Sequence, residues 1–143
     1  MNVEAILKGK GRSVMTIAPT ATVGDAVDLL REKGIGALVV SSDGATVAGI
    51  LSERDVVHAL ADRGAGLLAL QVSALMTRHV FTCQPGDSIA ELMAEMTERR
   101  IRHLPVIENG RLAGIVSIGD VVKNRLDEIE AEASSLRQFI TSA

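Results

Sequence analysis

Aromatic side chains are almost absent from this chain of 143 residues, which has two Phe, no Tyr and no Trp. The apolar fraction is nevertheless 47%, enough for the chain to fold around a core of its own. That core must therefore be aliphatic. The same shortage argues against stacking platforms for single-stranded nucleic acid, and a net charge of −3 without a basic run argues against a phosphate-backbone binder. We therefore expect no nucleic-acid partner.

Cysteine and long apolar runs are also scarce. Cys83 is the single cysteine, so no internal disulfide can form, and we expect it to be a small buried hydrophobic side chain. The alternative is a catalytic thiol, because a histidine could approach it in space. The histidines have no metal-ligand spacing with Cys83, so no metal site is predicted. No stretch approaches the roughly 20 apolar residues of a membrane span and no signal peptide is recognisable, so we expect a cytoplasmic protein without membrane contact.

Two stretches of the sequence repeat one another. Ala48–Val57 and Ala113–Val122 each contain a small residue, Gly, two aliphatic residues, Ser, two variable residues, Asp and Val-Val, and they begin 65 positions apart. Upstream landmarks recur 66 positions apart, as Pro19 and Pro85 do. Two copies indicate a tandem duplication and not a solenoid, which needs three or more repeats.

The hydrophobic periodicity predicts the same order of elements in both copies. The elements expected in the first copy are a short strand over 14–17, a helix capped by Thr22, a buried strand over 35–40, a strand over 46–51 and a helix that begins at Ser52. The elements expected in the second copy are a short strand over 80–82, a helix capped by Ser88, strands over 104–107 and 112–116, and a helix that begins at Ser117. Asn109-Gly110 between the last two strands fits a type I′ turn.

Each copy alone would be marginally stable, because it has about sixty residues and a small sheet. Two copies facing each other would bury both sheets. We therefore predict a mixed α/β (α+β) fold of two pseudo-symmetric β-α-β-β-α units packed sheet to sheet, with a cleft between them. The first unit would span residues 1–70 with a short N-terminal helix, the second residues 71–125, and an extended C-terminal helical tail residues 126–143.

The tail carries apolar residues with the 3,4 spacing of a seam between helices. These residues are Leu126, Ile129, Ala133, Leu136 and Ile140. The seam could pack on the body of the same chain. We expect instead that the protein associates with itself as a homodimer, through this tail or through flat helical faces.

Ser52-x-x-Asp55 and Ser117-x-x-Asp120 each lie where an expected strand turns into a helix. In the simpler interpretation each pair is a capping box. In the alternative, the hydroxyl and the carboxylate hold the two hydroxyls of a ribose, and the adjacent helix N-terminus favours a phosphate. Gly119 keeps the second of these turns open for a close approach. We name the two candidates the Asp55 half-site and the Asp120 half-site.

Basic residues make the two half-sites unequal. Arg102 and His103 stand at the start of a buried strand in the same copy as Asp120, where they could bind phosphate oxygens. The matching positions of the first copy are Gly36 and Ala37, which supply no base. We therefore expect the Asp120 half-site to be the stronger one.

Arg54 is the candidate substitute for the missing bases of the first copy. It lies in the first turn of an expected helix, where the helix dipole disfavours a cation. Reaching a phosphate across the cleft would explain its position, although an exposed arginine without a role is the alternative.

The repeated motifs resemble those of cystathionine-β-synthase (CBS) domains. The residues that carry the resemblance are Gly-Ile-Leu-Ser-x-x-Asp, Gly-Ile-Val-Ser-x-x-Asp and the Arg-His-Leu-Pro-Val before the second copy. The pair is similar to a Bateman module over roughly residues 12–125, and most similar to small stand-alone bacterial CBS-pair proteins. This resemblance implies a non-catalytic regulatory module that binds an adenosyl ligand between its units. AMP is the leading candidate, S-adenosylmethionine, ATP, ADP and NAD(H) are others, and the regulated protein is unknown.

The resemblance also implies roles for individual residues. These are ribose binding by Ser52, Asp55, Ser117 and Asp120, phosphate binding by Arg102 and His103 with Arg54 as a substitute, and adenine packing near Thr16 or Thr82. The competing interpretation is a structural protein-interaction module in which the Ser-x-x-Asp turns are only helix caps.

Overall fold

A computed structural model describes residues 1–142, and each copy of the repeat builds one unit around a small sheet. The first unit contains β1 (Thr16–Ile17), α2 (Val23–Lys33), β2 (Ala37–Val40), β3 (Gly49–Ser52) and α3 (Glu53–Arg63). The second contains α4 (Ile89–Arg99), β4 (His103–Glu108), β5 (Arg111–Ser117) and α5 (Ile118–Thr141). Helix α1 (Val3–Lys10) precedes both, and two short 3₁₀ helices, η1 (Gly64–Ala69) and η2 (Val72–Ala74), connect them.

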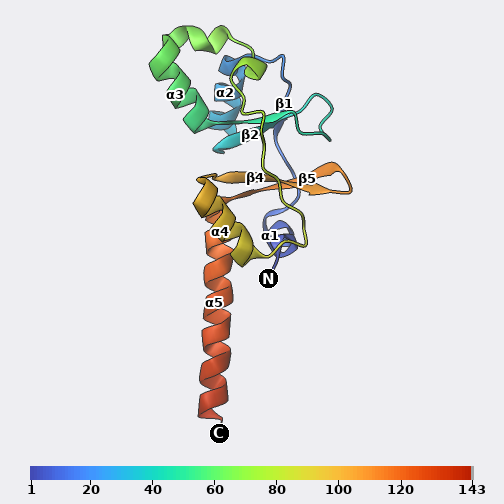
Figure 1. The fold of residues 1–143 in the computed structure, drawn as a ribbon, viewed down its shortest axis with the longest axis vertical. Coiled ribbons are helices and arrows are strands. Elements are labelled where there is room, and N and C mark those ends of the chain that lie inside the picture. Colours follow the sequence, from blue (N-terminus) through green and yellow to red (C-terminus); the bar gives the residue numbers. More distant parts are fainter. Residues whose placement is uncertain (143) are drawn as a thin grey trace.

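The two sheets lie one above the other in the middle of the molecule, and the helices lie on their outer sides (Figure 1). The units touch directly, because the backbone N–H of Leu112 in β5 donates to the carbonyl of Ala45 at 2.7 Å. The mixed α+β architecture of two β-α-β-β-α-like units is therefore confirmed.

The sheets differ by one strand. In the first unit β1 runs parallel to β2, and β2 pairs with β3 in antiparallel register, whereas the second sheet contains only β4 and β5. The strand predicted over 80–82 is wrong. Its place is taken by a single parallel bridge at Cys83, whose N–H donates to Pro105 O at 3.0 Å and whose carbonyl accepts from Ile107 N at 2.8 Å. Phe81, two residues before Cys83, forms no strand pairing, and its side chain packs against the second core.

Local signals in the sequence set the ends of the elements. Thr22, Ser52 and Ser117 each cap a helix, and in each case the third residue of the helix closes a capping box. Asn109 and Gly110 have φ values of 53° and 76°, as the predicted type I′ turn requires.

The core is aliphatic, as the composition predicts, and forms one main cluster for each unit. The first cluster contains Ile17, Ala26, Leu30, Leu38, Val40, Leu51, Val72 and Met76. The second contains Ile89, Leu92, Met96, Leu104, Val106, Val116 and Val121 together with Val3, Ile6 and Leu7 of α1. Helix α1 thus packs in the second core although it precedes the first unit in sequence. Grouping it with residues 1–70 does not describe its packing.

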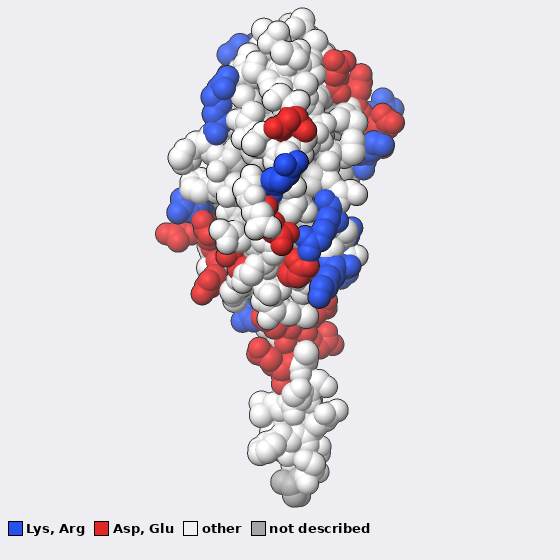
Figure 2. Space-filling model, turned by 90° about the vertical axis from the view of Figure 1, so that its right-hand side faces the viewer, with Lys and Arg blue, Asp and Glu red and all other residues white. Residues whose placement is uncertain are grey.

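Helix α5 extends well beyond the body of the molecule as a single rod (Figure 1). Leu126, Leu136 and Ile140 on this helix are at least 60% exposed. In the view of Figure 2 the far part of the rod shows no Lys, Arg, Asp or Glu beyond a band of acidic side chains. The predicted tail is therefore helical and does not fold back on the body. Its last residue, 143, lies outside the described residues.

Candidate functional site

A cavity of about 530 Å³ lies where the two units meet, within the size range of small-molecule sites. The first unit contributes Ser52, Glu53, Arg54 and Asp55 from the β3–α3 turn. The second unit faces them with Arg100, Arg102 and His103, which lie between the end of α4 and the start of β4. The remaining lining residues are Gly36, Ile50, Val57, His58, Thr77 and Ile101.

The Asp55 half-site opens onto this cavity with a carboxylate that is only partly used. Ser52 N donates to Asp55 Oδ2 at 2.9 Å, and Asp55 N donates to Ser52 Oγ at 3.2 Å. Within residues 1–142 the other carboxylate oxygen, Oδ1, accepts no hydrogen bond, and the Ser52 hydroxyl keeps its proton for donation. The turn can therefore cap α3 and still bind the hydroxyls of a ligand.

Gly36 makes room for the bases of the second unit. A Cβ at Gly36 would lie 3.3 Å from the Cε1 and Nε2 atoms of His103 and 3.2 Å from Glu53 Oε1. Gly36, which supplies no base in the first copy, is thus the residue against which His103 of the second copy packs. The expectation that Arg102 and His103 would serve the Asp120 half-site is corrected, because both line the cavity at Asp55.

The cavity gathers several positive side chains. Arg54 lines it as expected, and Arg100 and Arg102 of the second unit join it. From the sequence, Arg100 looked like an exposed residue at a helix end. Its place in the cavity depends on the left-handed conformation (φ 56°) with which it ends α4, and the sequence did not indicate that conformation. Glu53 and Asp55 are the carboxylates of the same wall. Three guanidinium groups against two carboxylates leave a site that can accept an anion.

His103 is half-buried between the two half-sites. Burial lowers the pKa of its imidazole, and the Lys10 ammonium and the Arg102 guanidinium lower it further, whereas the Glu53 and Asp120 carboxylates oppose the shift. The ring is therefore neutral at pH 7 in the free protein. A bound anion would favour its protonated form.

In the Asp120 half-site a lysine binds the carboxylate. Ser117 and Asp120 form the same capping box, with Ser117 N donating to Asp120 Oδ2 at 2.9 Å. The ammonium of Lys10 donates to the same oxygen at 2.7 Å and to Ile115 O at 3.1 Å. Burial alone would raise the pKa of Asp120, but the hydrogen bonds from Lys10 and Ser117 outweigh it and lower the pKa below the ordinary value of 3.8.

The two threonines proposed for adenine packing lie outside the cavity. Thr16 is in β1, opposite Val39, and Thr82 is exposed in the segment before α4. The cavity is lined instead by Thr77, which pairs with Ile50 through two backbone hydrogen bonds of 2.9 and 3.0 Å. No local sequence signal marked Thr77, because its place depends on pairing with a strand of the first unit.

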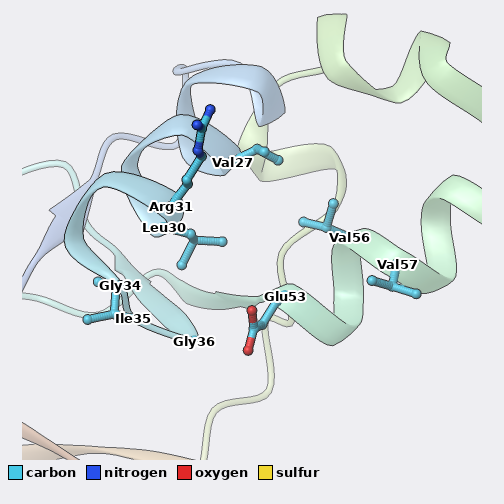
Figure 3. Close-up of a pocket in the computed structure, with 9 residues that line it drawn as sticks. All are labelled: Val27, Leu30, Arg31, Gly34, Ile35, Gly36, Glu53, Val56 and Val57. Carbon is cyan, nitrogen blue, oxygen red and sulfur yellow. The ribbon is translucent and has the colours of Figure 1, made fainter.

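A second hollow of about 440 Å³ lies between α2 and α3 and shares Gly36 and Glu53 with the cavity. Figure 3 shows that apolar side chains, among them Val27, Leu30 and Val56, extend into the space between the two helices. This hollow has an apolar lining with Arg31 and Glu53 as its charged groups. It offers no hydroxyl and no second base, so we do not assign the nucleotide chemistry to it.

Cys83 is 2% exposed, and burial together with Asp87 and Glu95 raises its pKa to about 12. Such a thiol is not a nucleophile at neutral pH. Among residues 1–142 there is no cluster of three or more His, Cys, Asp or Glu side chains that could hold a metal ion. Within the same residues, every helix is too short or too polar to cross a bilayer.

The family model described as "CBS domain" matches residues 10–62 and again residues 72–127. The chain belongs to the CBS-domain family. It is 48% identical to a CBS-domain protein of known structure, ATU1752 from Agrobacterium tumefaciens, with a TM-score of 0.84 over 87% of this chain and 99% of the other.

More distant relatives share the CBS-pair fold. The chain is 34% identical to the CBS domain-containing protein CBSX3, mitochondrial, of Arabidopsis thaliana, over 94% of this chain and 69% of that protein. The CBS domain pair of protein MJ0100, solved in complex with 5′-methylthioadenosine and S-adenosyl-L-methionine, superposes with a TM-score of 0.78 at 22% identity, over 90% of this chain and 98% of the other.

Proposed function

We propose that this CBS pair is a non-catalytic sensor of an adenine nucleotide, bound in the cavity between its units. AMP is the leading ligand, and ADP, ATP and NAD(H) are the other candidates. The observation that carries the proposal is the cavity itself, which sets Ser52 and Asp55 of one unit opposite Arg102 and His103 of the other. Groups that can bind ribose hydroxyls thus face groups that can donate hydrogen bonds to a phosphate, across a space of nucleotide size.

The lining suggests how the ligand lies. A ribose hydroxyl donates to the unused oxygen of Asp55, and the Ser52 hydroxyl donates to a ribose oxygen. The phosphate accepts from Arg102, His103 and Arg54. Ile50 and Thr77 supply the adenine surface in place of Thr16 and Thr82. The adenosyl compounds bound by the MJ0100 pair support this ligand class.

Because the nucleotide contacts both units, its binding would change their relative position and so the surface that a regulated partner protein meets. We place the protein in the cytoplasm as part of the same proposal.

The proposal includes a homodimer, and it is supported by the exposed apolar residues of the predicted seam on α5. Leu126, Ile129, Ala133, Leu136 and Ile140 occupy a and d positions of a heptad, and all but Ala133 are at least 45% exposed. The flanking charges complement a second copy. In a parallel pair Arg125 faces Glu130 of the second copy, and Glu132 faces Arg137.

A structural module without a ligand is the alternative, and one observation favours it. Both Ser-x-x-Asp turns form complete capping boxes, so each pair has a sufficient structural role already. The capping boxes exist in either case and therefore do not separate the two functions.

Calorimetric titration with AMP separates them. We expect the wild type to bind AMP below millimolar, and Asp55→Asn to weaken binding by at least about 10-fold, because a carboxylate that accepts hydroxyl protons contributes roughly 1.5–3 kcal/mol. Asp120→Asn is the matched control, since it alters the same position of the other capping box, and it should leave the affinity unchanged. Absence of binding by AMP, ADP, ATP and NADH would establish the structural module instead.

A further inference from the structure

Lys10 holds a position in the Asp120 half-site that a ligand would need. It is the last residue of α1, a helix anchored in the second core by Val3, Ile6 and Leu7. Its ammonium donates to Asp120 Oδ2 and to Ile115 O, the carbonyl two residues before Ser117. The side chains of Lys10 and Asp120 are only 36% and 26% exposed. This is therefore a partly desolvated pair, stronger than one held fully in water.

The Asp55 half-site has no such cation. The position that matches Lys10 by the 66-residue repeat is Met76, which is uncharged, 9% exposed and packed in the first core. Within the described residues no ammonium or guanidinium contacts Asp55. The Oδ1 atoms of both carboxylates accept no hydrogen bond there, so the half-sites differ in the cation that Lys10 places on Asp120 Oδ2.

The wall opposite Asp120 also lacks bases. Arg100 and Arg102, which face the Asp55 half-site, correspond by the same repeat to Gly34 and Gly36. A phosphate bound at Asp120 would therefore meet no guanidinium from the first unit. Lys10 is the cation in contact with Asp120 within residues 1–142, and it is already engaged by that carboxylate.

The loop that follows α1 is fixed in place. Arg12 pairs with Glu4 of α1 and with Glu108 of β4, the second pair at 3.3 Å. These contacts tie the end of α1 to the second sheet. Moving Lys10 away would break its ion pair and its bond to Ile115 O together, and a neutral ribose hydroxyl would replace a charged donor with a weaker one.

We propose that Lys10 is an internal counter-ion that occupies the Asp120 half-site in place of a ligand, so that each chain binds one nucleotide, at Asp55. This inference rests on the proposed function for the Asp55 half-site. It also states what the Asp120 half-site accepts once Lys10 is removed. The ligand is a nucleoside bound through its ribose, with little gain from a 5′-phosphate, because no guanidinium of the first unit faces it and the buried imidazole of His103 has a lowered pKa.

The test is the binding stoichiometry of the full chain, measured by calorimetry with AMP and with adenosine. Lys10→Met installs the residue found at the matching position 76, which packs in the first core. We expect one AMP per wild-type chain. Lys10→Met should bind a second molecule of nucleoside, with adenosine and AMP within about 3-fold of each other at the new site, and Lys10→Met with Asp120→Asn should lose only that molecule. Lys8→Met, an exposed lysine of the same helix, is the matched control and should leave the stoichiometry at one.

The outcomes separate this inference from the proposed function. Two AMP molecules on the wild type, one of them lost in Asp120→Asn, would overturn the role of Lys10 and keep the nucleotide sensor. A stoichiometry of one in a Lys10→Met variant that melts cooperatively, as the wild type does, would also overturn it. Adenosine binding by Lys10→Met that requires Asp120, with no AMP bound at Asp55, would support Lys10 as the counter-ion and refute the sensor. Absence of binding by every variant would refute both.

Discussion

The two half-sites start from the same motif and differ in what faces them. Their capping boxes are nearly superimposable in hydrogen bonding, with distances of 2.9 and 3.2 Å at Ser52–Asp55 and 2.9 and 3.1 Å at Ser117–Asp120. Across the cavity the Asp55 half-site faces two arginines, Arg100 and Arg102, and His103 of the second unit. At the Asp120 half-site, the carboxylate is bound by Lys10, which ends the helix α1 that packs in the core of the same unit.

This difference shows that the duplication preserved the scaffold while the charges became unequal. A strand that turns into a capped helix is a local structure, and each copy forms it independently. The groups that complete a half-site come from elsewhere in the chain, because the cavity lies between units. A difference in one copy, such as glycine at position 36 where the other copy has Arg102, therefore changes the site of the other copy as well.

The largest change in the comparison should come from removing the base that faces Asp55. We expect Arg102→Ala to weaken AMP about 10- to 150-fold, since a charge-assisted hydrogen bond to phosphate contributes roughly 1.5–3 kcal/mol. Adenosine, which has no phosphate, should bind as it does to the wild type. Arg111→Ala, an exposed arginine of β5, is the control for loss of charge. Equal losses for AMP and adenosine would show that Arg102 positions the cavity wall and does not hold the phosphate.

A pH series should sharpen the comparison next. The pKa of His103 lies below its ordinary value of 6.5 in the free protein, chiefly because of burial. If the AMP phosphate contacts the imidazole as proposed, binding should raise that pKa and take up a proton. Affinity should therefore rise about 3- to 10-fold as the pH falls from 7.5 to 6. Titrations in buffers of different ionisation enthalpy measure the proton uptake. His103→Gln should keep only the pH dependence of the phosphate itself, and an unchanged uptake in this variant would exclude the imidazole.

The serine caps should affect stability equally and binding unequally. We expect Ser52→Ala and Ser117→Ala each to reduce the free energy of unfolding by about 1 kcal/mol in urea, because each removes a hydroxyl that accepts the N–H of the third helical residue. Only Ser52→Ala should also weaken AMP. If Ser117→Ala weakened AMP as much, the Asp120 half-site would be occupied in the wild type.

The smallest effect should be the acid dependence of the Lys10 pair. The folded state holds Asp120 ionised below its ordinary pKa of 3.8, so the pair stabilises the fold above about pH 4, and this contribution is lost as the pH falls through the lowered folded-state pKa. The pair is partly exposed, so we expect less than about 1 kcal/mol. In urea unfolding, the free energies of Lys10→Met and wild type should differ at pH 6, and the difference should shrink as the pH falls below 3.8. A constant difference would assign the loss to packing of the lysine stem.

Much of the fold could be predicted because it depends on neighbours in the sequence. Thr22, Ser52 and Ser117 stand at helix starts because a side-chain oxygen can reach the backbone two or three residues later. Asn109-Gly110 turns the chain because both residues tolerate positive φ. The strand predicted over 80–82 was wrong, because whether an apolar segment joins a sheet depends on the partner strand.

The structure brings some of the candidate site residues together and leaves others, Ser117, Asp120, Thr16 and Thr82, outside the cavity. Ser52, Asp55, Arg54, Arg102 and His103 all line one cavity, as candidates named from the sequence. Thr16 and Thr82, which were predicted to lie near the adenine, do not line the cavity, whereas Thr77 does. Lys10, 110 positions before Asp120, had no sequence signal at all.

By itself the sequence determined the duplication, the order of strands and helices in each copy, the aliphatic core and the two capped Ser-x-x-Asp turns. All of these follow from periodicity, composition and contacts within a few residues. Only the tertiary structure decided that α1 packs in the second core, that Arg102 and His103 face Asp55, and that Lys10 binds Asp120. The physical reason is that these contacts join elements far apart in the chain, where packing of whole units sets the distances between charges.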